Sequence, residues 1–287
     1  MESESDQPAK RSAQRQLKTY EAVRSRVKTQ GPSRAFALFT LWSAIVVAMY
    51  VGVFLFSFGN RTVSEAVDAG GYAWNGILVF PILVFSSLAS GARERFGIRT
   101  KPPLGHWIVI GLVIVGFVVL AWLSLSGVDY PWALNLLMMV TIFFTIASRS
   151  IRQLRDKRAS NSDRWEAEPL NRSARCSTAL IGLVMGLLVA TSTQTWFPLL
   201  SAVVMMLLAV MLMGWQTRWG FPSTGYEWAP IHWVAFGITI SMLFLMTILL
   251  SRTAWITTPI SLATGVFILL VMLSASLLPL RAGHKQL

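Results

Sequence analysis

Uncharged apolar runs alternate with short polar segments along most of this chain of 287 residues. Each run is about 18 to 25 residues long, the length that an α-helix needs to cross a hydrocarbon core of about 30 Å. The ten-residue alternation typical of a membrane β-barrel is not visible. The pattern therefore predicts eight membrane-spanning helices, at 35–58, 72–90, 107–125, 132–148, 176–193, 196–215, 233–250 and 255–280.

A stretch near the middle of the first half of the chain recurs in the second half. Gly91-Ala-Arg-Glu-Arg95-Phe96-Gly97 matches Gly214-Trp-Gln-Thr-Arg218-Trp219-Gly220 in residue types and order. After two prolines in each copy, His106-Trp107-Ile-Val-Ile-Gly111 matches His232-Trp233-Val-Ala-Phe-Gly237. This recurrence indicates that the two halves of the chain are duplicated.

Small residues at four-residue spacing support the duplication. Such a stripe lets two helix backbones approach closely in lipid, where packing drives helix association. The first span has one and the fifth has another; their members are Ala44, Ala48 and Gly52, and Gly182, Gly186 and Ala190. The stripes predict helix packing, either between the halves or within each half. Because each half has an even number of spans, both halves run the same way through the membrane.

The fold class that follows is an all-α polytopic membrane protein, a parallel duplication of a four-helix unit. We divide the chain into a basic N-terminal arm, a first four-span repeat, a basic linker, a second four-span repeat and a short tail. Leu17, Tyr20, Val23 and Val27 in the arm are compatible with a surface helix at 13–28 or with a solvated basic segment. The five segments are 1–34, 35–148, 149–175, 176–280 and 281–287.

The formal net charge of +12 is distributed unevenly. With the N-terminus placed inside, 23 of the 25 Lys and Arg residues fall on the inner side, and only Arg61 and Arg252 fall outside. The positive-inside rule then predicts that both termini are cytoplasmic, in what we expect to be a bacterial cytoplasmic membrane. The basic segments favour contact with an anionic inner leaflet and a possible protein partner over binding of nucleic acid.

The duplicated turns contain the candidate binding residues. One interpretation is structural: in each turn the first glycine, Gly91 or Gly214, ends the outgoing helix, and Pro102-Pro103 or Pro222 keeps the linker extended. The arginines and the His-Trp pairs then anchor helix ends at the membrane interface. The other is a symmetric docking site for an anionic headgroup, a phosphate or a partner protein. The residues are Arg95, His106, Trp107, Arg218, His232 and Trp233.

The predicted spans contain no Asp, Glu, Lys or Arg in their interiors. Buried ionisable groups mark proton relays and ion coupling, so their absence counts against an ion-driven pump. Neutral polar residues remain; Asn135, Thr141 and Thr145 in the fourth span are candidates for a pore or ligand site, and interhelical hydrogen bonds are the alternative.

Evidence for an enzyme is slight. Glu65, Asp68 and Asp129 on the outer loops could serve a membrane-embedded transferase, but no histidine or other metal ligand accompanies them. The chain has one cysteine, Cys176, and neither a zinc-protease motif, a serine-hydrolase elbow nor a P-loop. We therefore expect no catalytic site, no metal site and no cofactor.

Duplicated membrane proteins include carriers that bind their substrate between the halves. The leading prediction is therefore a small permease, or a membrane subunit of a transport complex, for a neutral or lipidic solute. The alternative is a non-transporting interaction, assembly or regulatory subunit that presents a basic cytoplasmic surface to a partner.

Overall fold

The structure is a computed structural model that describes residues 33–59, 64, 75–96, 104–155, 169–213 and 220–278. Several sequence predictions lie outside these residues. They are the surface helix at 13–28, most of the outer loop with Glu65 and Asp68, much of the linker, Arg218 and the tail from 281.

The elements that the structure describes are all α-helices. Seven are long and apolar enough to cross a membrane, so the chain has the architecture of a helical membrane protein. Of the eight predicted spans, the sixth corresponds to α8, whose 17 described residues fall just short of that length. The helices are α2 (Arg34–Phe58), α4 (Asn75–Arg95), α5 (Leu104–Leu125), α6 (Ala133–Arg155), α7 (Arg172–Ala190), α8 (Phe197–Met213), the short α9 (Phe221–Glu227), α10 (Pro230–Arg252) and α11 (Thr258–Leu277).

Local side-chain chemistry explains where two of these helices begin. The Ser33 hydroxyl accepts a hydrogen bond from the Phe36 amide (3.2 Å) at the start of α2. Asn171 caps α7 in the same way, accepting from the Ala174 amide (2.8 Å). Such caps satisfy backbone amides that have no partner within the helix itself.

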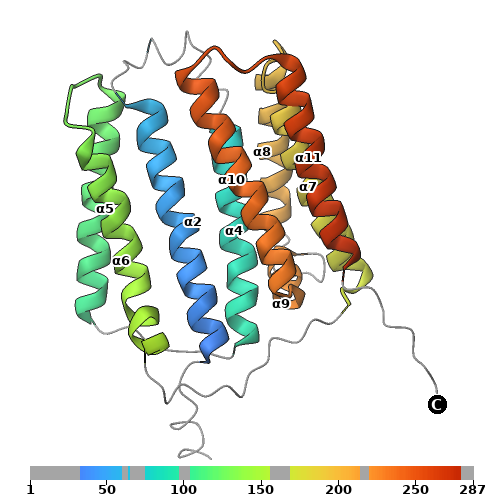
Figure 1. The fold of residues 1–287 in the computed structure, drawn as a ribbon, viewed down its shortest axis with the longest axis horizontal. Helices are drawn as coiled ribbons and strands as arrows, with labels where there is room; N and C mark the ends of the chain where they lie inside the picture. Colours follow the sequence, from blue (N-terminus) through green and yellow to red (C-terminus); the bar gives the residue numbers. More distant parts are fainter. Residues whose placement is uncertain are drawn as a thin grey trace, which may run out of the picture.

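The long helices stand side by side and alternate in direction, with the short α9 at the end of the bundle where α10 begins (Figure 1). Eight described arginines lie at the end where α2, α7 and α10 begin; they are Arg34, Arg93, Arg95, Arg149, Arg152, Arg155, Arg172 and Arg175. We call this the basic end. At the opposite end, the charged residues that the structure describes are Asp129 and Arg252.

The two small-residue stripes face partners within their own halves of the chain. A Cβ on Gly52 would overlap the Met139 side chain, which places this part of α2 directly against α6. A Cβ on Gly186 would lie 2.6 Å from the Gly265 carbonyl oxygen, and one on Gly182 would overlap Met272, so α7 packs backbone to backbone on α11. In each half, therefore, the first long helix packs closely on the last.

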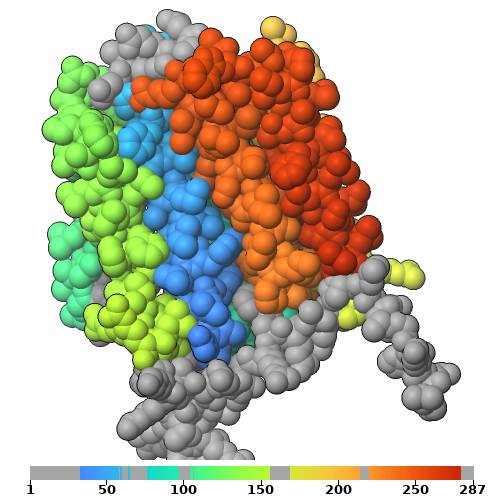
Figure 2. All heavy atoms as spheres, in the orientation of Figure 1, coloured from blue at the N-terminus to red at the C-terminus, as the bar shows by residue number. Residues whose placement is uncertain are grey.

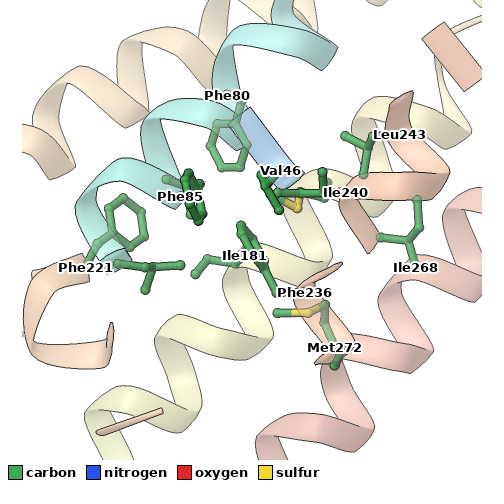
Figure 3. Packing of buried hydrophobic residues seen from close by; sticks show 14 of the residues in the cluster. Val46, Phe80, Phe85, Ile181, Phe221, Phe236, Ile240, Leu243, Ile268 and Met272 are labelled. Atoms are coloured by element: carbon green, nitrogen blue, oxygen red, sulfur yellow. The ribbon is translucent and has the colours of Figure 1, made fainter. Parts of the chain in front are cut away.

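One apolar core joins the two halves. Val46 and Phe85, near the middles of α2 and α4, are in the same buried cluster as Ile181 of α7, Ile240 of α10 and Ile268 of α11 (Figure 3). The space-filling view shows the atoms of α2 and α10 side by side on this face of the molecule (Figure 2). A smaller cluster lies between α2 and α6 and extends to α5.

Two expectations about the repeated turns are wrong. Gly91 does not end the second span, because α4 continues through it to Arg95. Pro222 does not hold an extended linker, since it lies in the first turn of α9, where proline's fixed φ and missing N–H are tolerated.

Candidate docking site at the basic end

The short helix α9 packs against the last turns of α4 through a glycine on each side. A Cβ on Gly91 of α4 would overlap the Pro222 carbonyl, and a Cβ on Gly225 of α9 would overlap the Leu88 carbonyl. Any larger residue at either position would force the two backbones apart. The two glycines therefore permit a backbone contact between segments far apart in the sequence.

Arg95 reaches from the end of α4 to the end of α9. Its Nη1 atom donates to the Tyr226 carbonyl oxygen (3.1 Å), one of the carbonyls that the short helix leaves unpaired. A cation at a helix C-terminus is also favoured by the helix dipole. Arg95 thus joins the two halves of the chain, a contact that its predicted roles as an interfacial anchor or docking residue did not include.

Glu227, the last residue of α9, binds the start of α7. Its carboxylate accepts hydrogen bonds from the Asn171 backbone amide (2.9 Å) and from the Asn171 side-chain amide. Because Asn171 is itself the N-cap of α7, the carboxylate lies at the positive end of the helix dipole. This residue pair therefore links the end of α9 to the start of α7.

His232 lies buried just inside α10, with both ring nitrogens hydrogen-bonded. The Ala229 amide donates to Nδ1 (3.0 Å), so the ring proton is on Nε2, which donates to the Leu278 carbonyl oxygen (2.9 Å). The imidazole therefore caps the start of α10 and holds the end of α11. A partner could reach it only after the surrounding helices move.

Trp233 is buried in a group of aromatic rings that crosses from one half of the chain to the other. Its ring centroid lies 4.8 Å from that of Phe39 and 5.3 Å from that of Trp42, both on α2. On the other side it meets Trp228 (5.0 Å), whose Nε1 donates to the Thr178 hydroxyl (2.9 Å). The second His-Trp pair is thus part of the core.

The first His-Trp pair has a different environment. Trp107, at the start of α5, is 58% exposed. The His106 side chain and Arg218 lie outside what the structure describes. The structure brings Arg95, His232 and Trp233 together around α9 and leaves Trp107 apart on α5, so a symmetric site that includes all six residues stays a prediction.

The intramembrane polar candidates do not gather in one place. Asn135 is buried and accepts a hydrogen bond from the Tyr130 hydroxyl (3.0 Å) at the opposite end of the bundle. Thr141 and Thr145 donate to carbonyls of their own helix, Leu137 and Thr141, both at 2.7 Å. Their hydroxyls are thereby satisfied within α6, as lipid requires.

The basic end can attract anions. Arg34, Arg93, Arg152 and Arg172 are exposed there, from four different helices. Among the described residues, no three His, Cys, Asp or Glu side chains lie close enough together to hold a metal ion. The exposed guanidinium groups offer electrostatic recognition and hydrogen-bond donors.

Sequence reasoning missed Asn171, Thr178, Glu227 and Trp228, which hold α9 in place. One signal was present: a glycine two residues before Pro222 resembles the start of a helix, where proline is common in the first turn.

Comparison with known protein families, with curated proteins and with solved structures found no match.

Proposed function

We propose that the chain is a non-transporting membrane subunit that binds a protein partner at its basic end. The observation that carries this proposal is the apolar packing at the middle of the bundle. A carrier built from repeats binds its solute between them, near the bilayer midplane. At that depth the space between the halves is filled by Val46, Phe85, Ile181, Ile240 and Ile268, all at most 4% exposed.

The proposal includes the predicted eight-span duplication with both termini cytoplasmic. Its support is the matched packing of the first and last long helix in each half, α2 on α6 and α7 on α11. The position of eight of the nine described arginines at one end supports the orientation, because cytoplasmic ends of spans are enriched in Lys and Arg.

The proposed docking surface consists of the exposed arginines at the basic end. Arg93 is on α4 and Arg172 is on α7, two helices that contact α9, and Arg152 is on α6. Fixed cations on rigid helix ends suit an acidic protein segment. Arg95 serves structure there rather than docking, since its guanidinium already binds the Tyr226 carbonyl.

Cysteine accessibility separates this proposal from a carrier. Val46→Cys and Ile240→Cys, each in a Cys176→Ser background, should react with a membrane-impermeant thiol reagent no faster than the cysteine-free chain. A carrier that opens alternately to each side would expose these positions, and their labelling from either side would contradict the proposal. Asp129→Cys, on an exposed loop, is the positive control.

Docking is tested by a photo-crosslinking amino acid placed at Arg152 or at Arg172 in cells that express the full chain. We expect a crosslinked protein band of discrete mass from either position and no such band from position 129 at the opposite end. Adducts to lipid alone from both basic-end positions would refute a stable protein partner.

A further inference from the structure

Helix α5 lies at the edge of the bundle and presents most of its surface outward (Figure 1). Among the described elements its main contacts are with α6 and, less extensively, α2. A Cβ added to Gly111, at the centre of the exposed face, would meet no atom within 4 Å. The exposed side chains around it are Leu104, Trp107, Ile108, Val115, Val118 and Trp122.

The matching stretch of α10 has a partner. Gly111 corresponds to Gly237 in the repeated His-Trp-x-x-x-Gly sequence, and each lies seven residues after the first residue of its helix. A Cβ on Gly237 would lie 3.2 Å from Nε1 of Trp42, so the α2 indole fills the hollow left by this glycine. The same motif is therefore a buried helix interface on α10 and an open surface on α5.

The repeat also identifies what would fill the hollow at Gly111. The small-residue stripes align Ala44 with Gly182, an offset of 182 − 44 = 138, and the same offset takes Trp42 to position 180. Leu180 is 41% exposed, and Leu183 and Leu187 extend the exposed stripe along α7. Trp42 and Leu180 each lie eight residues after the start of their helix, so the depths agree.

These two open faces lie on different edges of the bundle. Figure 1 shows α5 at one edge and α7, with α8 and α11, at the other, and these two described helices have no extensive contact with each other. The contact equivalent to α10 on α2 is therefore missing within one copy. A second copy placed alongside, in the same orientation, could supply it.

We infer that α5 of one copy packs on α7 of a second copy, with Leu180 in the hollow at Gly111, in the manner of Trp42 at Gly237. This inference rests on the proposed duplication. The contact is head-to-tail, because one face binds a different face, and such contacts form rings or rows rather than a closed two-fold dimer. Small residues that admit close helix approach are the usual basis of helix association in lipid.

Crosslinking between separately tagged copies tests the pairing. Gly111→Cys in one copy and Leu180→Cys in the other, both in a Cys176→Ser background, are reconstituted together in bilayers and treated with a short bifunctional thiol reagent. We expect a yield of intermolecular product several-fold above the yield from a mixture of Gly111→Cys with Val140→Cys, an exposed position on α6.

Addition of Gly111→Phe to the Leu180→Cys chain should leave the yield of this product unchanged, because that chain still offers its α7 face. A copy with Leu180→Trp, which carries at this position the residue found at Trp42, should also still associate with the other copy. Co-purification of the two tags measures this association.

Each alternative result has a defined meaning. Product no greater than with Val140→Cys means that lipid covers α5 and overturns the inference. Crosslinking of Gly111→Cys to itself means a two-fold contact and overturns the head-to-tail arrangement. An intrachain pair, Trp42→Cys with Gly237→Cys, tests the contact between α2 and α10 that serves as the pattern for the inference. Failure of this pair to crosslink removes the basis of the inference. Accessibility at Val46 and Ile240 is measured independently, so the proposed function can fail or stand separately.

Discussion

Arg252 is one of two basic residues that the sequence places on the outer side, against the general trend of the chain. Its Nε atom donates to the Phe56 carbonyl oxygen (2.7 Å) and its Nη2 atom to the Gly59 carbonyl oxygen (2.8 Å). Both acceptors are at the end of α2, where helix carbonyls lack partners. The exception to the charge pattern thus has a structural explanation: a planar guanidinium joins the end of α10 to the end of α2.

Replacing Arg252 should destabilise the protein in proportion to the donors lost. We expect Arg252→Ala to cost about 1 to 2 kcal/mol, a charged hydrogen bond discounted for its exposed position. Arg252→Lys should cost less, since an ammonium keeps the positive charge and N–H donors on a single nitrogen but lacks the planar fork of the guanidinium. Unfolding in mixed micelles by titration with a denaturing detergent measures both. Arg149→Ala, an exposed arginine on α6, is the control, and an equal loss there would contradict this role for Arg252.

At the scale of elements, the α4–α9 contact depends on the absence of side chains. Gly91→Ala should destabilise the fold by about 1 to 3 kcal/mol, because the added methyl overlaps the Pro222 carbonyl. The same change at Gly116 of α5, where a Cβ would lie 3.9 Å from Met138, should stabilise by up to about 1 kcal/mol through helix propensity. The same detergent titration compares the two, and equal effects would argue against the close contact.

The long helices were predictable because length and apolarity are local properties of the sequence. The end of α4 was placed too early, at residue 90, because glycine at 91 suggested a helix stop when its actual role is backbone contact with α9. Helix α9 was missed because seven residues carry too little periodicity to mark a helix. The stripes at Gly52 and Gly186 predicted close packing, but their partners on α6 and α11 depend on the three-dimensional arrangement.

The candidate site was predictable in part. Arg95, His232 and Trp233 were selected from the repeat, and they do lie around α9. Their partners Tyr226, Leu278 and Phe39 come from distant segments, and no spacing rule connects them. The different burial of Trp107 and Trp233 was also beyond the sequence, since identical motifs can face lipid in one half and a neighbouring helix in the other.

At the scale of the whole molecule, the proposed orientation predicts which end faces outward. Asp129→Cys and Arg172→Cys, each in a Cys176→Ser background, lie at opposite ends of the bundle and are both exposed. An impermeant maleimide added to intact cells should label position 129 at once and position 172 only after permeabilisation, because clusters of arginine stay on the cytoplasmic side. Labelling in the reverse order would invert the topology.

The packing of α2 on α6 also bears on biosynthesis. The ribosome completes α2 well before α6, and at roughly 5 to 20 residues per second several seconds separate the two. During that interval Gly52 has no Met139 to cover it. The same delay recurs for Gly186 until Gly265 of α11 emerges. A nascent chain halted after α5 would therefore hold a bare glycine face in the membrane, available to an insertase or to any neighbouring helix.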